Sequence, residues 1–393
     1  MSSSDGQTRD LVTTMPGAGW DYSLTRHPYH EIERPFGPHY CVYNRRLMAC
    51  CFDALSTEDG YWRLRQQAAV LHTGEFPLEF TGPDAEKLLN RLFTKDITRL
   101  KPGRCGYGLA CYEDGGLLVD GILLRLGSER FWYAQADGDF FSWARAHASG
   151  LNVTISDPGV FVSQVQGPES LNILASAAAE GLPDPFGYFA LATVNFGGQD
   201  VVISRTGYTN ELGWEFYTES HHDAGALWDH LCKAGAAFGM ELFGLDSMHI
   251  RRIEAGILNA GSDFDQTTTP YDVGLGLFVD TDKADFIGKN ALQHSPTESR
   301  LTGLLCEAEP HIGAEVKING RLAGRVTAGA ISPYLQQGIG IALMDKSGIQ
   351  PGTLAEIGCV DGNLHPGKLA SLPLYDEKGE IQRGKKIAIP ERP

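Results

Sequence analysis

Two carboxylates occupy positions where a charged side chain is costly, and both have chemical uses. Asp120 is the only charged residue in the apolar segment 117–124. Burying a carboxylate there is expensive unless the group is paired or takes part in a reaction, for example by moving a proton. The pattern also allows Asp120 to face solvent on an edge strand, because Val119 and Gly121 do not decide which face is buried.

Glu215 is the second carboxylate, and its neighbours are aromatic. It lies between Trp214 and Phe216, shortly after the polar turn 205–210. A carboxylate in this position could accept two N–H donors of a heterocycle in a bidentate manner. The alternation with Trp214 and Phe216 fits a solvent-facing strand residue equally well, so the pattern leaves both interpretations open.

Two arginines and two tyrosines form a third group of candidates. Arg252 could clamp an anionic ligand, but a single arginine more often pairs with a nearby acid on a surface. Arg205 and Tyr208 belong to the same polar turn that precedes Glu215. Tyr107 is typical of a packed aromatic residue as much as of a catalytic one.

The elements that must position these residues contain a repeat. An alternating segment leads through Gly82-Pro83-Asp84 into apolar residues at helical spacing, and the same order recurs at Gly167-Pro168-Glu169. Proline at the first helical position and an acid in the first turn suit a helix start. The pattern predicts a duplicated strand–helix body, with chance similarity between two ordinary turns as the alternative.

The remaining pattern predicts an α+β fold. Strands are predicted at residues 116–127, 131–136, 151–155, 200–204 and 213–218, and helices at 139–148, 223–238 and 245–257. Beyond residue 299, short strands with glycine turns predict a small β-barrel or sandwich. We expect an extended, proline-rich arm (1–50), a duplicated α+β body of two subdomains (51–295) and a C-terminal β domain (296–393).

Composition excludes several classes of partner. The 393 residues include 33 basic and 49 acidic side chains, a formal net charge of −16. Without a block of Lys and Arg residues, the sequence offers no basic surface for the phosphate backbone of a nucleic acid. An anionic membrane would repel a chain of this charge. No run approaches the roughly 18 apolar residues of a membrane helix, and the N-terminus lacks the regions of a signal peptide. We therefore expect a cytoplasmic protein with a small-molecule substrate and with no nucleic-acid or membrane partner.

Neither disulfides nor a metal site are expected. The eight cysteines contain no C-x-x-C pair and are scattered through the chain. His221, His222 and His230 have no Cys or Glu at ligand spacing. The pattern does not indicate an oligomeric state.

Several motifs, taken in order, resemble the folate-dependent aminomethyltransferase family: the glycine-cleavage T-protein and its demethylase relatives. The similarity extends over about residues 40–375. It rests on Gly103-Arg104-Cys105-Gly106-Tyr107, Asp114-Gly115-Gly116-Leu117-Leu118-Val119-Asp120, Gln166-Gly167-Pro168, Arg205-Thr206-Gly207-Tyr208-Thr209, Gly213-Trp214-Glu215, Arg252-Ile253-Glu254-Ala255-Gly256, Asp285-Phe286-Ile287-Gly288-Lys289 and Ser332-Pro333.

The resemblance implies a three-domain cloverleaf around a central channel that binds tetrahydrofolate. By position, Asp120 would be the catalytic carboxylate near the reacting nitrogen, and Glu215 would hold the pterin through paired hydrogen bonds. The resemblance places Tyr107, Tyr208, Arg205 and Arg252 along the folate channel, with Arg252 near the anionic tail. If an acid must protonate a leaving group, the candidates are Tyr107, Tyr43 and His72, although His72 is otherwise most simply a structural residue.

The departures from the family pattern favour a demethylase. Val119 stands where the family usually has Asp or Asn, and the triplet Val119-Asp120-Gly121 is similar to that of the folate-using aromatic O-demethylases. The first hypothesis is therefore transfer of a methyl group from a small sulfonium, aromatic methyl ether or N-methyl compound to N5 of tetrahydrofolate. The alternatives are a glycine-cleavage aminomethyltransferase, which yields methylene-tetrahydrofolate, and a non-enzymatic folate-binding protein.

Overall fold

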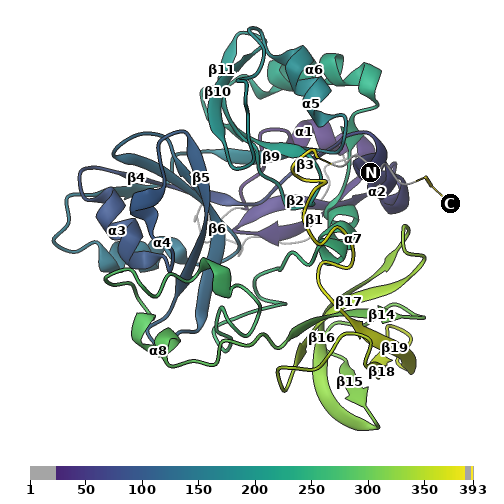
Figure 1. Ribbon diagram of the computed structural model, residues 1–393. Helices are drawn as coiled ribbons and strands as arrows, with labels where there is room; N and C mark the ends of the chain where they lie inside the picture. Colours follow the sequence, from purple (N-terminus) through teal and green to yellow (C-terminus); the bar gives the residue numbers. More distant parts are fainter. Residues whose placement is uncertain (1–23, 386–390, 393) are drawn as a thin grey trace, which may run out of the picture.

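The structure, a computed structural model, describes residues 24–385, 391 and 392 (Figure 1). Its strands form one hairpin, a five-stranded sheet, a six-stranded sheet and a closed barrel. Figure 1 shows three lobes, in which the two sheets carry helices and the barrel forms the third. The mixed α+β class and the small C-terminal barrel are thus confirmed.

The five-stranded sheet has helices on one face only. Its order is β5 (Arg104–Cys111), β6 (Leu117–Arg125), β7 (Arg130–Gln135), β4 (Phe76–Thr81) and β8 (Thr154–Ser156). Helices α3 (Ala85–Leu92) and α4 (Phe140–His147) bury Val119 and Leu123 of β6 beneath them. Because side chains alternate along a strand, Asp120, Ile122 and Leu124 belong to the other face of β6.

The six-stranded sheet is built in the same way. Its order is β10 (Leu191–Phe196), β11 (Gln199–Ser204), β12 (Gly213–Thr218), β9 (Phe161–Gln166), β3 (Ala69–His72) and β13 (Glu241–Leu242). Helices α5 (Ser170–Ala177) and α6 (Ala224–Gly235) pack on Trp214 and Phe216 of β12. Glu215 and Tyr217 therefore project from the opposite face of β12.

The helix-free faces of the two sheets pack against each other. Leu124 and Trp132 of one sheet form a buried cluster with Val162 and Tyr217 of the other. This contact decides both orientations that the sequence left open. Asp120 and Glu215 face the space between the sheets, and they are only 8% and 5% exposed.

The two turns of the predicted repeat have the same geometry. Gly82 has φ +120° and Gly167 has φ +126°, and a Cβ at either residue would lie 2.6 or 2.5 Å from a backbone oxygen. Each glycine is followed three residues later by the first residue of a helix, Ala85 or Ser170. Both positions therefore need glycine for the same two reasons, its permitted φ and the absence of a side chain.

The predicted N-terminal arm is partly wrong, because residues 30–52 form regular structure. α1 (His30–Glu33) precedes a hairpin of β1 (Pro38–Tyr43) and β2 (Arg46–Phe52). Pro38 is tolerated because it is the first residue of its strand. Asn44 and Arg45 both have positive φ (50° and 59°), as a tight two-residue hairpin turn requires. Residues 1–23 of the arm lie outside the described residues.

The barrel completes the fold at the C-terminal end. Its closed order is β14 (Leu301–Cys306), β17 (Gln337–Met344), β16 (Arg321–Ser332), β15 (Glu315–Ile318), β18 (Leu354–Gly358) and β19 (Leu364–Ala370). α7 (Leu245–Ala255) packs against β16 and β17 on one side and α2 (Thr57–Gln66) and β2 on the other. All eight cysteines are free, as expected.

A buried charge cluster joins these parts around Glu254 of α7. Its carboxylate accepts hydrogen bonds from the hydroxyls of Tyr61 (2.7 Å), Ser332 (2.5 Å) and Tyr375 (2.5 Å). It also lies 3.4 Å from Arg251 Nη1 and 3.8 Å from Arg65 Nη1. Both arginines pair in turn with Glu211, at 2.8 and 2.7 Å. The cluster therefore links α2, α7, the 205–215 segment, the barrel and the C-terminal segment.

We expect Glu254→Gln to destabilise the protein by about 3–5 kcal/mol, because removing one partner leaves buried charge uncompensated. The measurement is urea unfolding followed by tryptophan fluorescence. Glu58→Gln is the control, since Glu58 makes an exposed ion pair with Arg392 at 3.3 Å and its loss should cost less than about 1 kcal/mol. Equal unfolding midpoints for the two variants would contradict this role of Glu254.

Candidate functional site

A cavity of about 720 Å³ lies between the two sheets and is closed by the 255–260 and 373–383 segments. Five of the predicted site residues line it: Tyr43, Tyr107, Asp120, Tyr208 and Glu215. They come from β1, β5, β6, the 205–210 turn and β12, which are far apart in the sequence. The packing of the helix-free sheet faces thus collects polar groups that no local pattern relates.

One oxygen of the Asp120 carboxylate is hydrogen-bonded to a neighbouring side chain, and the other is available to a ligand. Its Oδ2 accepts a hydrogen bond of 2.7 Å from the Tyr107 hydroxyl. Its Oδ1 is buried and has no hydrogen-bond partner among the described residues. Burial raises the pKa of Asp120 from 3.8 to about 6, because a carboxylate loses hydration that one hydrogen bond does not replace. A carboxyl that titrates near neutrality can take up or release a proton at physiological pH.

Glu215 is held more firmly than Asp120. Its Oε2 accepts from the Thr206 hydroxyl at 2.6 Å and from the Tyr217 hydroxyl at 3.1 Å, and Oε1 accepts from Gln164 Nε2 at 3.3 Å. Burial nevertheless raises the pKa of Glu215 above its usual range. These bonds fix the orientation of the carboxylate, and a ligand with N–H donors would find it pre-organised.

Three tyrosines supply aromatic surface to the cavity. Tyr107 packs on Phe278, with ring centroids 4.5 Å apart. The Tyr208 hydroxyl donates to the carbonyl of Leu258, which fixes the cavity wall at that residue. Burial raises the pKa of the Tyr43 hydroxyl, and the nearby charges of Glu75, Tyr208 and Asp120 add to that shift. Tyr43 and Tyr107 thus remain protonated and present neutral hydroxyls.

Glu75 is a third carboxyl of the cavity that sequence reasoning missed. Its Oε2 is buried without a hydrogen-bond partner among the described residues. Burial raises its pKa, and the charges of Glu215 and Asp120 raise it further. The sequence offers only a weak signal, a single acid between Gly74 and the apolar start of β4 at Phe76.

Two predicted residues lie behind the cavity wall instead of in it. Arg252 is buried and pairs with Asp263, and its Nη1 also donates to the carbonyl of Ile257 at 3.2 Å. It therefore positions the 257–260 segment that lines the cavity. Arg205 donates to the carbonyl of Phe186 at 2.8 Å and lies 5.8 Å from the Trp214 ring centroid. Neither guanidinium is among the groups that line the cavity.

His72 also lies outside the cavity, as the structural alternative proposed. Its ring stacks on Tyr29 and His27 at centroid distances of 4.4 and 4.8 Å, and Nδ1 is 2.8 Å from the Ser163 hydroxyl. Burial lowers its pKa to about 3, so the ring stays neutral. A neutral, enclosed imidazole has no proton to give to a leaving group in the cavity.

Two of the basic side chains that line the cavity come from a segment in which sequence reasoning had no candidate, and Lys95 is a third. Lys378 and Arg383, in the segment after the barrel, line one side of it. Arg383 is held in place by the carbonyls of Lys378 and Gly379, both at 2.7 Å. Sequence reasoning missed these residues because nothing in the pattern places the last segment beside the sheets.

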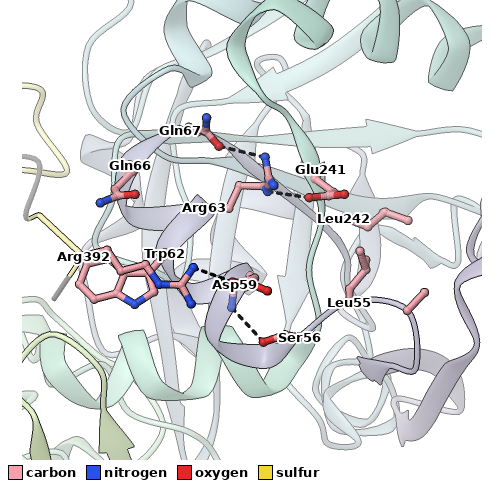
Figure 2. A pocket seen from close by; sticks show the side chains of 12 residues that line it. Leu55, Ser56, Asp59, Trp62, Arg63, Gln66, Gln67, Glu241, Leu242 and Arg392 are labelled. Atoms are coloured by element: carbon pink, nitrogen blue, oxygen red, sulfur yellow. Dashed lines mark hydrogen bonds and ion pairs between the residues drawn. The ribbon is translucent and has the colours of Figure 1, made fainter.

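At two other candidate sites, several polar side chains are already engaged in ion pairs or hydrogen bonds. A hollow of about 310 Å³ beside α2 (Figure 2) contains paired charges, with Arg63 on Glu241 at 2.7 Å and Arg392 on Asp59 at 2.6 Å. Contrary to the sequence expectation, one Glu does lie near the paired histidines. Glu219, His221 and His222 bring ligand atoms within 4.8 Å of one another. Both nitrogens of His222 already contact backbone groups, at 2.9 and 3.1 Å.

Among the described residues, no helix has the length and apolar character that crossing a membrane requires.

Comparison with known proteins agrees with this architecture. The GCVT N-terminal domain matches residues 43–283, and the glycine cleavage T-protein C-terminal barrel domain matches residues 300–376. The structure is similar to the glycine cleavage system aminomethyltransferase T of Bartonella henselae, with a TM-score of 0.81 and 25% identity, covering 90% of this chain and 99% of that one.

Two curated relatives carry different names. The dimethylsulfoniopropionate demethylase DmdA of Ruegeria pomeroyi is 30% identical over 335 residues, which cover 82% of this chain and 90% of the relative. The trimethylamine-oxide aldolase of the same organism is 33% identical over 369 residues, 88% of this chain. The matched region is 46% of that aldolase, so the chain spans about half of its length. From the two domain matches, the shared fold and these relatives, we conclude that the chain belongs to the folate-dependent aminomethyltransferase family, an enzyme family that includes the glycine-cleavage T-protein and its demethylase relatives.

Proposed function

We propose that the protein is a tetrahydrofolate-dependent methyltransferase, a demethylase that moves a methyl group from a small methylated compound to N5 of tetrahydrofolate. The observation that carries the proposal is Asp120. It is a buried carboxyl with a raised pKa, its Oδ1 has no hydrogen-bond partner among the described residues, and it lines the cavity between the two sheets beside Tyr107. A transfer that releases a proton needs such a group near the reacting atoms.

The residues of the cavity fit a reduced folate. Glu215 offers a fixed carboxylate to the N–H donors of a pterin, because Thr206, Tyr217 and Gln164 already orient it. The cavity volume of about 720 Å³ lies within the range of cofactor sites. In this proposal Lys378 and Arg383 take the place of Arg252 as the partners of the anionic tail, since Arg252 is committed to Asp263.

When bound, tetrahydrofolate would supply N5 as the acceptor: the methyl carbon bonds to it, the donor heteroatom keeps the electron pair, and the proton of N5 is released. Asp120 takes up that proton on Oδ1, while the Tyr107 hydroxyl holds Oδ2 at 2.7 Å and fixes the carboxyl plane. Asp120 is buried and Tyr107 is half-buried between the sheets. Alignment of two reactants in this way can supply roughly 7–11 kcal/mol of a displacement barrier.

The alternative within the same family is an aminomethyltransferase that gives methylene-tetrahydrofolate. Val119 in place of the usual Asp or Asn favours the demethylase, because this position precedes the catalytic carboxylate. Val119 is fully buried under α3 and α4 and brings no second polar group to the cavity. The product decides between the two reactions, 5-methyl against 5,10-methylene-tetrahydrofolate. A non-enzymatic folate-binding protein would form neither.

We expect reduced folate to raise the melting temperature of the wild-type protein under anaerobic conditions. Saturation at about 100 times Kd should stabilise the fold by roughly 2.7 kcal/mol. Glu215→Ala should weaken the shift, and Glu215→Gln, which keeps the side-chain shape, should weaken it as well because one acceptor becomes a donor. If neither variant differs from the wild type, Glu215 does not bind the pterin. If no sample shifts, the methyltransferase proposal falls.

The cost of keeping Asp120 buried gives a second prediction. Because its pKa is raised, the folded state favours the protonated form, so stability is lost as pH rises from about 4 through 6. Asp120→Asn removes this loss. The variant should match the wild type near pH 4 and be more stable by up to about 3 kcal/mol at pH 8, while its methyl-transfer activity falls.

Urea unfolding at several pH values measures this difference. Asp345→Asn is the matched control, because Asp345 is exposed and follows β17, and this variant should lose stability between pH 4 and 8 just as the wild type does. A constant difference between Asp120→Asn and the wild type from pH 4 to 8 would mean that Asp120 is not a desolvated carboxyl.

A further inference from the structure

The inner part of the cavity holds three carboxyl groups, and their ionised forms are disfavoured because burial raises the pKa of each. Glu75 Oε2 and Asp120 Oδ1 are both buried and without hydrogen-bond partners among the described residues. Within the residues that the structure describes, no ion pair joins Glu75, Asp120 or Glu215 to a basic side chain. Glu215 has three donors, whereas Glu75 and Asp120 retain oxygens that a ligand can use.

The basic side chains near this region are committed to other groups. Arg46 donates to the backbone carbonyls of Glu75 and Val160, both at 2.8 Å, and its guanidinium lies 4.2 Å from the Phe161 ring centroid. Lys95 lines the cavity, but its ammonium group lies 5.3 Å from the Phe278 ring centroid. The charge of Arg46 lowers the pKa of Glu75, but burial and the charges of Glu215 and Asp120 outweigh it and raise that pKa to about 8. Near neutral pH the Glu75 carboxyl therefore ionises fully only if a further positive charge comes beside it.

Aromatic surface surrounds the same carboxyls. Tyr43 packs so closely against Gly74 that a Cβ there would lie 2.7 Å from the Tyr43 Cβ, and Glu75 is the next residue. The charges of Glu75 and Asp120 both act on the hydroxyls of Tyr43 and Tyr208, so the four side chains lie close together. Carboxylates next to aromatic rings are a typical environment for methylated cations.

The sequence left three classes of methyl donor open: a sulfonium, an aromatic methyl ether and an N-methyl compound. They differ in the charge that they would bring to these carboxyls. An ionised carboxyl buried without a partner is unfavourable, and a cation of matching size relieves that cost. A neutral methyl ether supplies no charge that would stabilise the ionised Glu75, and an anionic aromatic ether would make its ionisation still less favourable. A methylated ammonium or a sulfonium supplies the missing charge and places methyl groups against the tyrosine rings.

We propose that Glu75 is the specificity-determining residue of the methyl donor site and recognises a positively charged donor, a methylated ammonium or a sulfonium, with Tyr43 and Tyr208 against its methyl groups. The proposal rests on the proposed function, since it names the donor for that reaction. It gives Glu75 a role in binding and leaves proton transfer to Asp120.

The test compares choline with its neutral carbon isostere, 3,3-dimethylbutan-1-ol, by isothermal titration calorimetry on the full chain. The wild type should bind choline at least tenfold more tightly than the isostere. Glu75→Gln should reduce that preference to about twofold or less. Glu79→Gln is the matched control, because Glu79 is a nearby carboxyl of β4 that bonds Arg130 and Trp132, outside the cavity; it should keep the full preference.

Several results would overturn the proposal: equal binding of choline and the isostere to the wild type, an unchanged preference in Glu75→Gln, or tighter binding of 4-methoxybenzoate than of choline. The wild-type comparison needs no variant, so a misfolded Glu75→Gln leaves the test intact. The tetrahydrofolate melting shift, measured on the same samples, separates the two proposals. Its absence together with a choline preference would count against the proposed function alone.

Discussion

The buried carboxylate of Glu254 is the interaction on which the arrangement of the parts depends. Three hydroxyls and two arginines, drawn from α2, α7, the barrel and the C-terminal segment, converge on it. Of these, Tyr375 has the most direct consequence for function. It anchors the segment that continues to Lys378 and Arg383, so a hydrogen bond to Glu254 of α7 helps to position two basic groups of the cavity. The charge cluster around Glu254 is therefore connected to the candidate site through Tyr375 and the segment that follows it.

The cavity exists because both sheets are covered on one face only. Helices bury the apolar side of each sheet, and the opposite faces meet with a mixed surface of aromatic, aliphatic and carboxyl groups. Where large side chains such as Trp132 and Tyr217 meet, the interface is closed. Where Asp120, Glu215 and Glu75 meet, it is hollow, because carboxyls cannot pack on one another without a counter-charge. Burial is the main cause of the raised pKa of all three carboxyls, and the charges of Glu215 and Asp120 add to the shift of Glu75.

Much of the fold could be predicted from local pattern, and the site only in part. The Gly-Pro-acid turns, most strands of the sheets and the barrel depend on neighbouring residues, which the sequence displays directly. The face occupied by Asp120 depends on packing between sheets whose strands lie far apart in the sequence, so alternation alone gave two answers. Arg252 was predicted beside a ligand and instead pairs with Asp263, since the fold brings an acid eleven residues away into contact. Glu75 was missed because one acid at the start of a strand is an ordinary surface pattern.

The distribution of charge within the cavity has a consequence for how two ligands would share it. Lys378 and Arg383 come from the segment after the barrel, whereas Glu75, Asp120 and Glu215 come from the two sheets and the strand connection between β3 and β4. The anionic tail of an acceptor can pair directly with Lys378 or Arg383, although Asp376 and Glu377 of the same segment also line the cavity. The second group repels such a tail, and only the N–H donors of the acceptor can bind there, at Glu215. A cationic donor experiences the reverse. This distribution of charged groups would therefore orient both molecules and bring the neutral end of the acceptor toward the donor. Glu75 should therefore act on the methyl donor, and Lys378 and Arg383 on the folate. A substitution of Glu75 should leave the affinity for the folate largely unchanged, and a substitution of Lys378 or Arg383 should leave the affinity for the methyl donor largely unchanged.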